Sequence, residues 1–429
     1  MVYKVIGLMS GSSLDGLDIA YVHLQERAGS SRQTPGELQT RGAQQTPGAQ
    51  QTPRAWDFQL VHTDCYPYSA GWRERLAAAP RLTAQDYHLL HTEYGHYLGS
   101  QVLSFIEAHG LEYQVQLIAS HGHTALHWPA RKMTAQLGDG AAISATTRIN
   151  VVSDLRAMDI ALGGQGAPIV PIGEKLLLPG YGLFLNLGGI ANISAHGAGG
   201  VAAPGAGAGA AAGFVAYDVC PANRVLNELA GDEGLTYDKD GALAAGGRVD
   251  GELLRRLNAL SYYGMGYPKS LANEFGLDTV LPLVRAGGLS TADALRTYTE
   301  HIAEQVQRAA NALTAGARVN ADGGAPAGTG AAAGADAAAD TGGGRAAVRM
   351  LVTGGGAHNG LLTARLRERL AESDVELVIP DAALVDFKEA LVMALIGVLR
   401  WREENNVLAS VTGASRDSIG GAVWIGQGA

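Results

Sequence analysis

The sequence predicts an α/β protein made of two similar domains. At 429 residues the chain is too long for one ordinary hydrophobic core, which suggests about two domains. Each half opens with two apolar segments joined by a glycine-containing turn, at Gly11 in the first half and at Gly188 and Gly189 in the second. In both halves, helices with one apolar face and short apolar strands follow the hairpin. This recurrence predicts a duplicated α/β unit, with a ligand in the cleft between the two copies.

The first half contains the clearest helix signal. Apolar runs bounded by turn residues predict strands over residues 3–9, 17–24 and 57–66. A helix is expected from its N-cap Thr83 through about His109, with Gly110 as the stop signal. Two further strands are expected over residues 115–120 and 151–154.

The second half repeats the pattern. Strands are expected over residues 182–186, 190–194 and 349–353. A helix over residues 292–313 has an apolar face that comprises Leu295, Tyr298, Ile302, Val306 and Ala309. The last helix, over residues 388–402, has an apolar face that comprises Leu391, Ala394, Leu395, Val398 and Leu399.

Three low-complexity tracts interrupt this pattern. Residues 25–55 are polar and proline-rich, and residues 195–213 and 315–346 are almost pure glycine and alanine. We interpret all three as surface loops or disordered insertions, because alanine-rich sequence so interspersed with glycine seldom forms a helix. The expected domains are residues 1–160, with the first insertion, and residues 161–429, with the other two.

The composition describes a globular protein and points away from two classes of partner. Apolar residues make up 47% of the chain, charged residues 17%, and the formal net charge is −9. Nucleic acid and anionic membranes do not attract such a chain, so we expect neither as a partner. Cys65 and Cys220 cannot form a disulfide framework, and neither a signal peptide nor a run of 18 apolar residues is evident. We therefore expect a soluble, cytoplasmic protein.

The turn of the first hairpin has the composition of a phosphate-binding loop. Gly11 and Gly16 leave the backbone N–H groups open to a phosphate chain, because no Cβ blocks the approach. The carboxylate of Asp15 is suited to a metal ion that bridges phosphates. An ordinary glycine-rich hairpin tip is the alternative that this segment alone leaves open.

Eight motifs, in the same order along the chain, resemble those of the anhydro-N-acetylmuramic acid kinases. They occupy residues 9–16, 120–122, 163–168, 186–192, 217–223, 268–270, 354–359 and 388–390. The resemblance implies a two-domain actin-like ATPase (ribonuclease H-like) fold, with the nucleotide in the interdomain cleft. It also implies that ATP and water convert 1,6-anhydro-N-acetylmuramic acid into N-acetylmuramic acid 6-phosphate, in the recycling of cell-wall peptidoglycan.

The resemblance also implies an ATP site and a magnesium site. The expected ATP-binding residues are Met9, Ser10, Gly11, Ser12, Ser13, Leu14, Asp15, Gly16, Asn186, Gly188, Gly189, Asn192, Gly354, Gly355, Gly356 and Asn359. The amides of Asn186 and Asn192 could instead be structural. Asp15 and Glu389 are the expected Mg²⁺ residues, although Glu389 could simply be an exposed glutamate in the first turn of the last helix.

Asp218 is the expected catalytic residue. It follows an apolar run and precedes a proline and a helix, which places it at the C-terminal end of a strand. A carboxylate there can take a proton from the water that attacks the anomeric carbon, although it could also be a helix N-cap. The family motif Asp-Thr-Gly-Pro-Gly-Asn is altered, with Val219, Cys220 and Ala222 at the changed positions. We interpret Cys220 as a small buried side chain.

Three residues are expected to bind the sugar. His121 is assigned to sugar binding by the resemblance, with a hydrogen-bonded turn histidine as the alternative. Arg156 is suited to the lactyl carboxylate through two parallel hydrogen bonds, but it could instead pair with Asp154 or Asp159. Lys269 would position substrate or phosphate, unless it is simply solvated.

Two other functions stay open. A kinase for a simpler anhydrosugar, such as levoglucosan, would not need a cation for a lactyl carboxylate. A nucleotide-switched binding protein of the actin and Hsp70 type would need neither Asp218 nor sugar contacts. Family members are often dimers, so a homodimer is possible.

Overall fold

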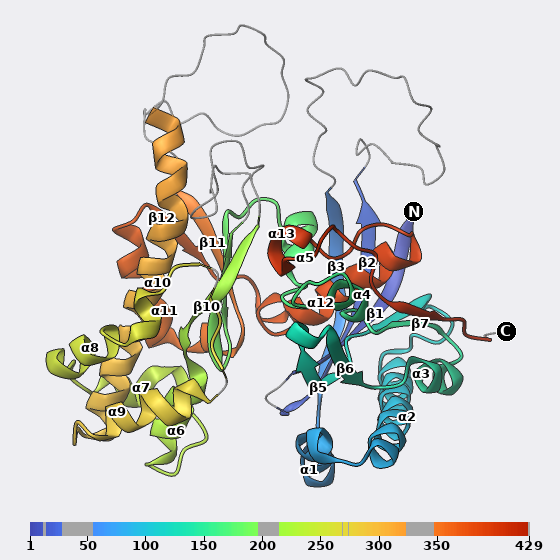
Figure 1. The fold of residues 1–429 in the computed structure, drawn as a ribbon, viewed down its shortest axis with the longest axis horizontal. Coiled ribbons are helices and arrows are strands. Elements are labelled where there is room, and N and C mark those ends of the chain that lie inside the picture. The colour runs from blue at the N-terminus through green and yellow to red at the C-terminus, as the bar shows by residue number, and fades with distance from the viewer. Residues whose placement is uncertain are drawn as a thin grey trace, which may run out of the picture. The chain divides into compact units, whose positions relative to one another are not determined.

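The computed structural model describes residues 1–11, 14–27, 55–195, 214–267, 269–272, 274–322 and 347–427 (Figure 1). The chain forms two compact units: unit 1 is Met1–Pro179 with Asp381–Ala429, and unit 2 is Gly180–Pro380. The C-terminal segment therefore belongs to the first unit, which differs from the predicted division at residues 160 and 161. The reason is α12 (Ala382–Trp401), which contacts β1 (Val2–Ser10), β2 (Gly16–Glu26) and β4 (Leu117–Ser120) of unit 1.

Unit 1 is built on a six-stranded sheet with the order β13-β7-β4-β1-β2-β3. Its remaining strands are β3 (Trp56–Pro67), β7 (Asn150–Ser153) and β13 (Ala422–Trp424). Strands β1, β2 and β3 form an antiparallel meander, whereas β4 pairs parallel with β1 and β7 pairs parallel with β4. A separate two-stranded sheet contains β5 (His123–Trp128) and β6 (Met133–Leu137).

The helices of unit 1 include the predicted long helix. Besides α12, they are α1 (Ala70–Ala78), α2 (Ala84–His109), α3 (Gly140–Thr147), α4 (Ala157–Ala161), α5 (Pro171–Leu177) and α13 (Ala409–Thr412). The hydroxyl of Thr83 caps α2 by accepting from the backbone N–H of Asp86 at 3.2 Å. Gly110 ends the helix in the left-handed conformation, with φ of 61°. Both predicted ends of this helix are therefore confirmed.

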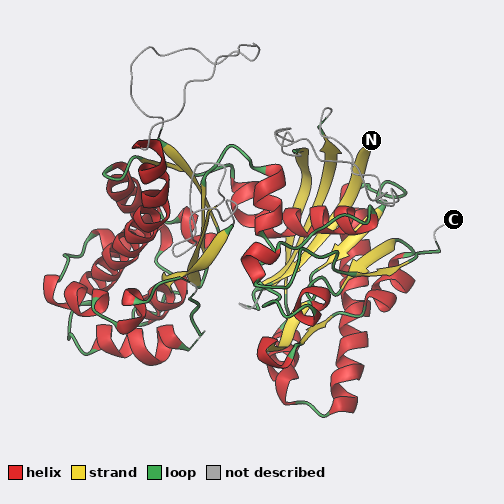
Figure 2. Ribbon diagram, turned by 45° about the horizontal axis from the view of Figure 1, so that its top comes forward, coloured by secondary structure: helices red, strands yellow, loops and turns green. Residues whose placement is uncertain are grey.

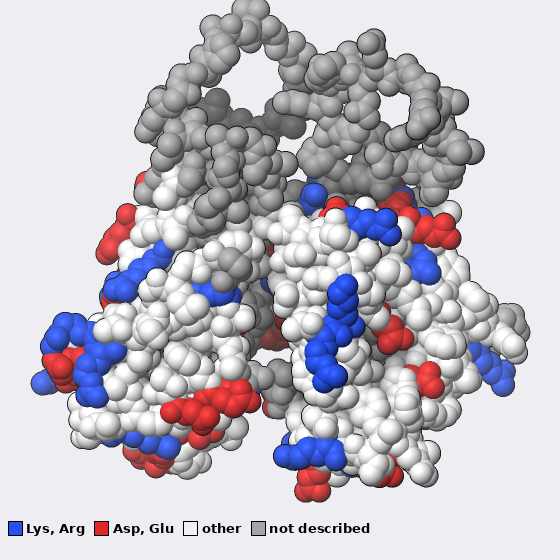
Figure 3. Space-filling view, viewed as in Figure 1, with Lys and Arg blue, Asp and Glu red and all other residues white. Residues whose placement is uncertain are grey.

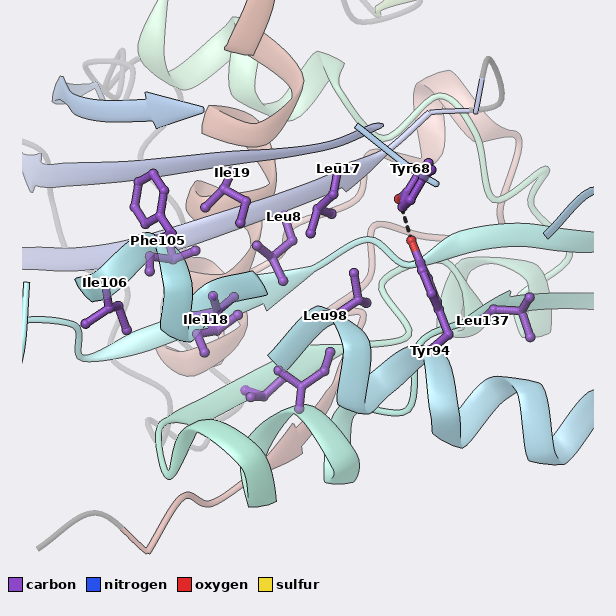
Figure 4. Packing of buried hydrophobic residues seen from close by; sticks show 14 of the residues in the cluster. Leu8, Leu17, Ile19, Tyr68, Tyr94, Leu98, Phe105, Ile106, Ile118 and Leu137 are labelled. Atoms are coloured by element: carbon purple, nitrogen blue, oxygen red, sulfur yellow. Dashed lines mark hydrogen bonds between the residues drawn. The ribbon is translucent and has the colours of Figure 1, made fainter. Parts of the chain in front are cut away.

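The core of unit 1 lies between its sheet and α2. Leu8, Leu17 and Ile19 of β1 and β2 are fully buried and belong to one cluster with side chains of α2, which include Leu98 and Phe105 (Figure 4). Each such side chain contributes about 1.5–3 kcal/mol by leaving water. The burial of these side chains thus fixes the hairpin from which the first phosphate-loop motif projects.

Helix α12 approaches β1 so closely that one position of the strand must be glycine. A Cβ added to Gly7 would lie 1.9 Å from the backbone oxygen of Ala390, which is shorter than any van der Waals contact. This close approach brings Lys388 and Glu389 of α12 to the sheet from which the phosphate-loop motif begins.

Unit 2 is built on a five-stranded sheet with the order β10-β9-β8-β11-β12. Its strands are β8 (Leu183–Leu187), β9 (Ile190–Ala195), β10 (Val215–Pro221), β11 (Val348–Thr353) and β12 (Val375–Val378). Its helices are α6 (Asn223–Gly231), α7 (Ala242–Ala245), α8 (Gly251–Asn258), α9 (Leu281–Arg285), α10 (Thr291–Asp322) and α11 (Gly360–Ala371). Figure 2 shows these helices and strands by type.

The two sheets share one topology. In unit 2, β8, β9 and β10 form an antiparallel meander, β11 pairs parallel with β8, and β12 pairs parallel with β11. This is the arrangement of β1, β2, β3, β4 and β7 in unit 1. The predicted duplication, and with it the two-domain actin-like ATPase class, is confirmed.

Two helices extend beyond their predicted bounds. α12 begins at Ala382 rather than at residue 388, because the carboxylate of Asp381 accepts from the N–H of Leu384 at 2.8 Å and caps the helix. α10 continues to Asp322, so the prediction of a loop from residue 315 was wrong for residues 315–322. The alanines there favour the helix. The rest of the insertion predicted over residues 315–346, and nearly all of the other two, lie outside the described residues.

The helices and the surface of the protein bear on the partners excluded from the sequence. Within the described ranges, no helix is both long and apolar enough to cross a lipid bilayer. On the face drawn in Figure 3, both units carry basic and acidic side chains. The expected lack of a nucleic-acid or membrane partner stays a prediction.

Candidate active site

The first phosphate-loop motif lies at the tip of the β1–β2 hairpin. Met9 and Ser10 end β1, Gly16 begins β2, and Gly11, Leu14 and Asp15 lie in the turn between them. The N–H of Leu14 donates to the carbonyl of Gly11 at 3.4 Å, and the side chain of Asp15 is exposed. Ser12 and Ser13 lie outside the described residues. The structure therefore places the described part of the motif in one turn, as the sequence predicts.

The hydroxyl of Ser10 is directed into the protein. It accepts from the Tyr68 hydroxyl at 2.9 Å and lies 3.4 Å from Nδ1 of His123. Tyr68 in turn shares a hydrogen bond of 2.6 Å with Tyr94, drawn as the dashed line in Figure 4. Burial lowers the pKa of His123 to about 4, so its ring is neutral near pH 7. This network holds the end of β1, and the Ser10 side chain would have to turn to contact a phosphate.

Carboxylates gather beside this hairpin, and one of them was not predicted. Burial, together with repulsion from Glu389, Asp386 and Asp15, raises the pKa of Asp18 in β2 to about 6, while a hydrogen bond with Cys65 acts in the opposite direction. Asp18 was not singled out from the sequence, although a carboxylate inside an apolar strand was the available signal.

The donor set fits Mg²⁺. Magnesium prefers oxygen ligands and usually takes one or two carboxylates, with water and substrate phosphates completing its shell. Asp15, Asp18 and Glu389 offer such oxygens. The described residues contain no group of three or more His, Cys, Asp or Glu side chains placed to hold a metal ion by themselves. A magnesium ion here would therefore depend on phosphate oxygens as well.

Glu389 does not lie in the first turn of its helix. It follows a kink at Phe387, where φ is −114°, and therefore lies well inside α12. The alternative of an exposed glutamate in the first turn is thus wrong. Burial raises the pKa of Glu389, whereas Lys388 and Arg156 lower it. Lys388 itself forms a buried ion pair of 2.8 Å with Glu174 of α5.

Arg156 and His121, both predicted to bind sugar, contact one another. Nε of Arg156 donates to Nε2 of His121 at 2.9 Å. Nδ1 of His121 donates to the carbonyl of Gly122 at 2.8 Å. Both ring nitrogens are therefore occupied, which corresponds to the alternative of a hydrogen-bonded histidine. A direct sugar contact by His121 would require one of these bonds to break.

The alternative ion pairs of Arg156 do not form. The carboxylate of Asp159 accepts from the N–H of Gly166 at 2.7 Å and from the hydroxyl of Thr412 at 2.6 Å. Asp154 accepts from the hydroxyl of Ser153 at 3.3 Å. Among the described residues, Arg156 makes no salt bridge with either aspartate. Its guanidinium instead experiences the attraction of Glu389, while burial lowers its pKa to about 10.

The predicted ATP-binding motif of residues 186–192, here called the second phosphate-loop motif, includes the β8–β9 turn of unit 2. The carbonyls of Gly188 and Gly189 accept from the N–H groups of Asn223 and Ala222 at 3.1 and 2.8 Å. The side chain of Asn223 also donates to the carbonyl of Leu187 at 2.9 Å. The turn is therefore tied to the start of α6. Asn223 belongs to the motif of residues 217–223 but was not predicted to be a site residue.

The predicted ATP-binding motif of residues 354–359 lies beside this hairpin. A Cβ added to Gly354, whose φ is +84°, would lie 2.4 Å from the side-chain oxygen of Asn186, so only glycine fits there. Gly355 and Gly356 begin a short 3₁₀ helix, Gly355–His358. The side chain of Asn359 caps α11 by accepting from the N–H of Leu362 at 3.0 Å. Unit 2 thus brings two of the predicted ATP-binding motifs together.

Asp218 lies within a strand rather than at its end. It occupies β10 next to a register shift between Asp218 and Cys220, which is a β-bulge. Bulges alter the direction of a side chain, which is why they occur beside active sites. The prediction that Asp218 ends its strand was wrong, because β10 continues through the bulge to Pro221. It is also not a helix N-cap, because Ala222 holds that position in α6.

The carboxylate of Asp218 is held by two donors. Its Oδ1 accepts from the side-chain amide of Asn192, and its Oδ2 accepts from the N–H of Leu271 at 2.7 Å. Burial raises the pKa of Asp218, and these two hydrogen bonds act in the opposite direction. The structure therefore connects Asn192, predicted to bind ATP, to the predicted base.

Lys269 lies beside the same strand. Its Nζ lies 4.7 Å from the ring centroid of Tyr262 and 5.5 Å from that of Tyr217. The Tyr262 hydroxyl donates to the backbone oxygen of Asp218 at 2.5 Å. Burial lowers the pKa of Lys269, so this ammonium is not simply solvated. Cys220 is fully buried, as predicted, and burial raises its pKa.

The family model and the relatives found by sequence agree on one family. The family model described as anhydro-N-acetylmuramic acid kinase matches residues 48–329 and 327–426. The anhydro-N-acetylmuramic acid kinase of Rhodococcus erythropolis is 33% identical over 99% of this chain and 94% of its own. That of Gloeobacter violaceus is 32% identical over 96% of both chains.

Among solved structures, the chain is similar to the activator of 2-hydroxyisocaproyl-CoA dehydratase from Clostridium difficile with bound ADPNP. The TM-score is 0.41 at 12% identity, over 94% of this chain and 96% of that chain. The assignment to a family rests on the sequence matches. The chain belongs to the anhydro-N-acetylmuramic acid kinase family.

Proposed function

We propose that this kinase opens the 1,6-anhydro ring of 1,6-anhydro-N-acetylmuramic acid with water and phosphorylates O6 from ATP. The observation that carries the proposal is the environment of Asp218. Its carboxylate is oriented by Asn192 and by the N–H of Leu271, and burial raises its pKa. A carboxylate offers about four acceptor positions, so two bound donors leave room for a water molecule. This is the arrangement that a general base needs.

The proposed reaction balances as one hydrolysis and one phosphoryl transfer. The oxygen of water bonds to C1 of the sugar as Asp218 accepts a proton, and the bond between C1 and O6 breaks. O6 then bonds to the γ-phosphorus of ATP, and the bond to the β-phosphate oxygen breaks, which releases ADP. The proton leaves Asp218 for solvent. The products are N-acetylmuramic acid 6-phosphate and ADP.

ATP binding is assigned to the motifs of both units. In unit 2, the glycines of the β8–β9 turn and of residues 354–356 leave backbone accessible to the nucleotide. In unit 1, the β1–β2 turn contributes its backbone N–H groups to the phosphates. Asp15 and Glu389 would hold Mg²⁺, which neutralises phosphate charge when bound. Asp18 belongs to the same group of carboxylates.

The sugar contacts are assigned to two cations. The guanidinium of Arg156 matches a lactyl carboxylate, because its planar N–H groups donate two parallel hydrogen bonds. Lys269 precedes Leu271, whose N–H donates to Asp218, by two residues, and we assign it the positioning of substrate or phosphate. Because the anhydrosugar comes from peptidoglycan and ATP is a cytoplasmic nucleotide, we place the enzyme in the cytoplasm, in cell-wall recycling. A homodimer remains part of the proposal.

The test is a comparison of substrates. The full chain is incubated with ATP, Mg²⁺ and either 1,6-anhydro-N-acetylmuramic acid or levoglucosan, and ADP and sugar phosphate are measured. We expect turnover of the first substrate, with a kcat/KM far above that for levoglucosan. A preference for levoglucosan would replace this substrate with a simpler anhydrosugar. Nucleotide binding without turnover of either sugar would favour a nucleotide-switched binding protein.

A further inference from the structure

His121 is fixed to the sheet of unit 1 through its backbone and its ring. It directly follows β4, and its N–H donates to the carbonyl of Leu8 in β1 at 3.1 Å. Its side chain is 3% exposed. Because Nε2 accepts from Arg156, the proton of the neutral ring lies on Nδ1, which donates to the carbonyl of Gly122. The hydrogen bonds thus define a single tautomer.

The charge state of the ring is equally well defined. Burial and the positive charge of Arg156 lower the pKa of His121 to about 3. The imidazole is therefore neutral near pH 7 and acts as a fixed acceptor for the guanidinium. A protonated ring could not accept from Arg156 and would repel it.

The contact restricts how Arg156 can bind an anion. A guanidinium has five N–H donors in a planar fork, and it can present either its Nε side or its two terminal nitrogens to a carboxylate. His121 occupies Nε, so the four N–H groups of the two terminal nitrogens remain for other partners. Glu389, whose charge attracts Arg156, is one of the groups near this guanidinium.

We propose that His121 is a positioning residue that orients Arg156 so that its two terminal nitrogens bind the carboxylate of the sugar acid. This inference rests on the proposed function, in which Arg156 receives that carboxylate. His121 itself touches no substrate. Its contribution is to hold the plane of the guanidinium in one orientation before the ligand binds. Without this contact, the flexible side chain of Arg156 would lose conformational entropy on binding, which weakens affinity.

The test measures binding of two ligands that differ at the lactyl group, which is a charged carboxylate in one and a neutral methyl ester in the other. Calorimetry with a non-hydrolysable ATP analogue present gives the Kd of 1,6-anhydro-N-acetylmuramic acid and of its lactyl methyl ester. The variants of the full chain are His121→Phe, His121→Gln, Arg156→Leu, Arg156→Lys and the double variant of His121→Phe with Arg156→Leu. Phe keeps the ring volume without an acceptor, whereas the side-chain oxygen of Gln can accept from Nε.

We expect wild type to prefer the acid over the ester. His121→Phe should weaken binding of the acid roughly 10- to 100-fold, as expected for a misplaced binding group, and leave the ester unchanged. His121→Gln should restore most of the preference. Arg156→Lys should lose it, because an ammonium has no planar fork. The double variant should bind the acid no more weakly than Arg156→Leu alone.

Two results would overturn the inference: equal weakening of both ligands by His121→Phe, or additive effects of the two single substitutions. His301 of α10 is also fully buried, and burial lowers its pKa to about 3. His301→Gln is therefore the control for the loss of a buried neutral histidine, and it should lower the thermal midpoint without changing the preference for the acid. Because Kd is measured without turnover, it tests this inference independently of the proposed reaction. Selective binding that depends on His121 supports this inference even if no phosphorylated product forms, and only the proposed reaction then fails. A wild type that binds acid and ester equally overturns the inference.

Discussion

The side-chain amide of Asn192 donates to Oδ1 of Asp218 from the directly opposite position on the neighbouring strand. The register of β9 and β10 places these two residues opposite one another in the absence of any ligand, and side chains opposite one another in an antiparallel pair lie close enough to interact. The amide of a residue assigned to the phosphate loop therefore orients the residue assigned to general-base catalysis.

Asp218→Asn should remove turnover while nucleotide binding persists. The amide keeps the size of the side chain but cannot accept a proton from water, and general-base catalysis is worth roughly 10²- to 10⁴-fold in rate. Steady-state kinetics and nucleotide titration check this prediction. Full activity of this variant would exclude Asp218 as the base.

Asn192→Ala should shift the pH profile toward higher pH. Burial raises the pKa of Asp218, and the hydrogen bond from Asn192 lowers it, so removing the amide leaves a still higher pKa. A general base acts when it is deprotonated, so kcat/KM falls as the pH falls through this pKa. The acidic limb of kcat/KM should therefore lie above the ordinary aspartate range in wild type and higher still in Asn192→Ala. An unchanged limb in the variant would contradict the assignment.

Gly7→Ala should destabilise unit 1. The new methyl group would lie 1.9 Å from the carbonyl oxygen of Ala390, and such overpacking typically costs about 1–3 kcal/mol or more. Gly71→Ala in α1 is the matched control, because the nearest atom to its new Cβ lies 4.0 Å away and alanine favours a helix. Urea unfolding of both variants measures the difference. Equal midpoints would show that α12 lies farther from β1.

Acidification should destabilise unit 2 through His301. Nδ1 of this buried histidine donates to Asn258 at 2.7 Å, and Nε2 accepts from Tyr263 at 3.0 Å. Burial lowers its pKa to about 3, below the ordinary value of 6.5. Between these values the unfolded chain binds more protons, so stability is complete above pH 6.5 and declines as the pH falls toward 3. Unfolding followed at several pH values should show a smaller acid loss in His301→Gln.

In the buried ion pair of Glu174 and Lys388, replacing only Glu174 should lower the free energy of unfolding more than replacing both residues. The two side chains lie 2.8 Å apart and are each 4% exposed. Replacing one partner removes the nearest counter-charge of a buried ion, which typically costs about 3–5 kcal/mol, whereas an apolar pair of similar volume is often neutral. We expect Glu174→Leu to unfold far more readily than the double variant of Glu174→Leu with Lys388→Met. Equal unfolding midpoints would contradict this account of the pair.

Local signals explain which parts of the fold could be predicted. The N-cap Thr83 and the C-cap Gly110 lie next to the helix that they delimit, so both ends of α2 could be predicted from local residues. The start of α12 was missed because Asp381 was not recognised as an N-cap, although its side chain caps the helix. The bulge at Asp218 depends on pairing with β9, which residue types alone do not specify.

The contacts of the candidate site were harder to predict than its residue types. The motifs selected Asp218, Arg156 and the glycine turns as candidates because each matches a chemical need, and their roles stay predictions. The pairing of Arg156 with His121 joins residues 35 positions apart, and that of Lys388 with Glu174 joins residues 214 apart. Such contacts depend on how α12, β4 and the segment after β7 pack, which no local pattern contains. Asp18 illustrates the same limit, because its raised pKa comes first from burial and then from carboxylates that include Glu389 and Asp386 of α12.

The most direct test of the central claim uses ¹⁸O-labelled water. The full chain is incubated with ATP, Mg²⁺ and 1,6-anhydro-N-acetylmuramic acid, and the product is examined by mass spectrometry before the anomeric hydroxyl exchanges with solvent. Coupled hydrolysis and phosphorylation predict a sugar 6-phosphate that carries one ¹⁸O at the anomeric hydroxyl, and none with Asp218→Asn. A phosphorylated sugar without the label, or a labelled product formed equally well by that variant, would contradict the account.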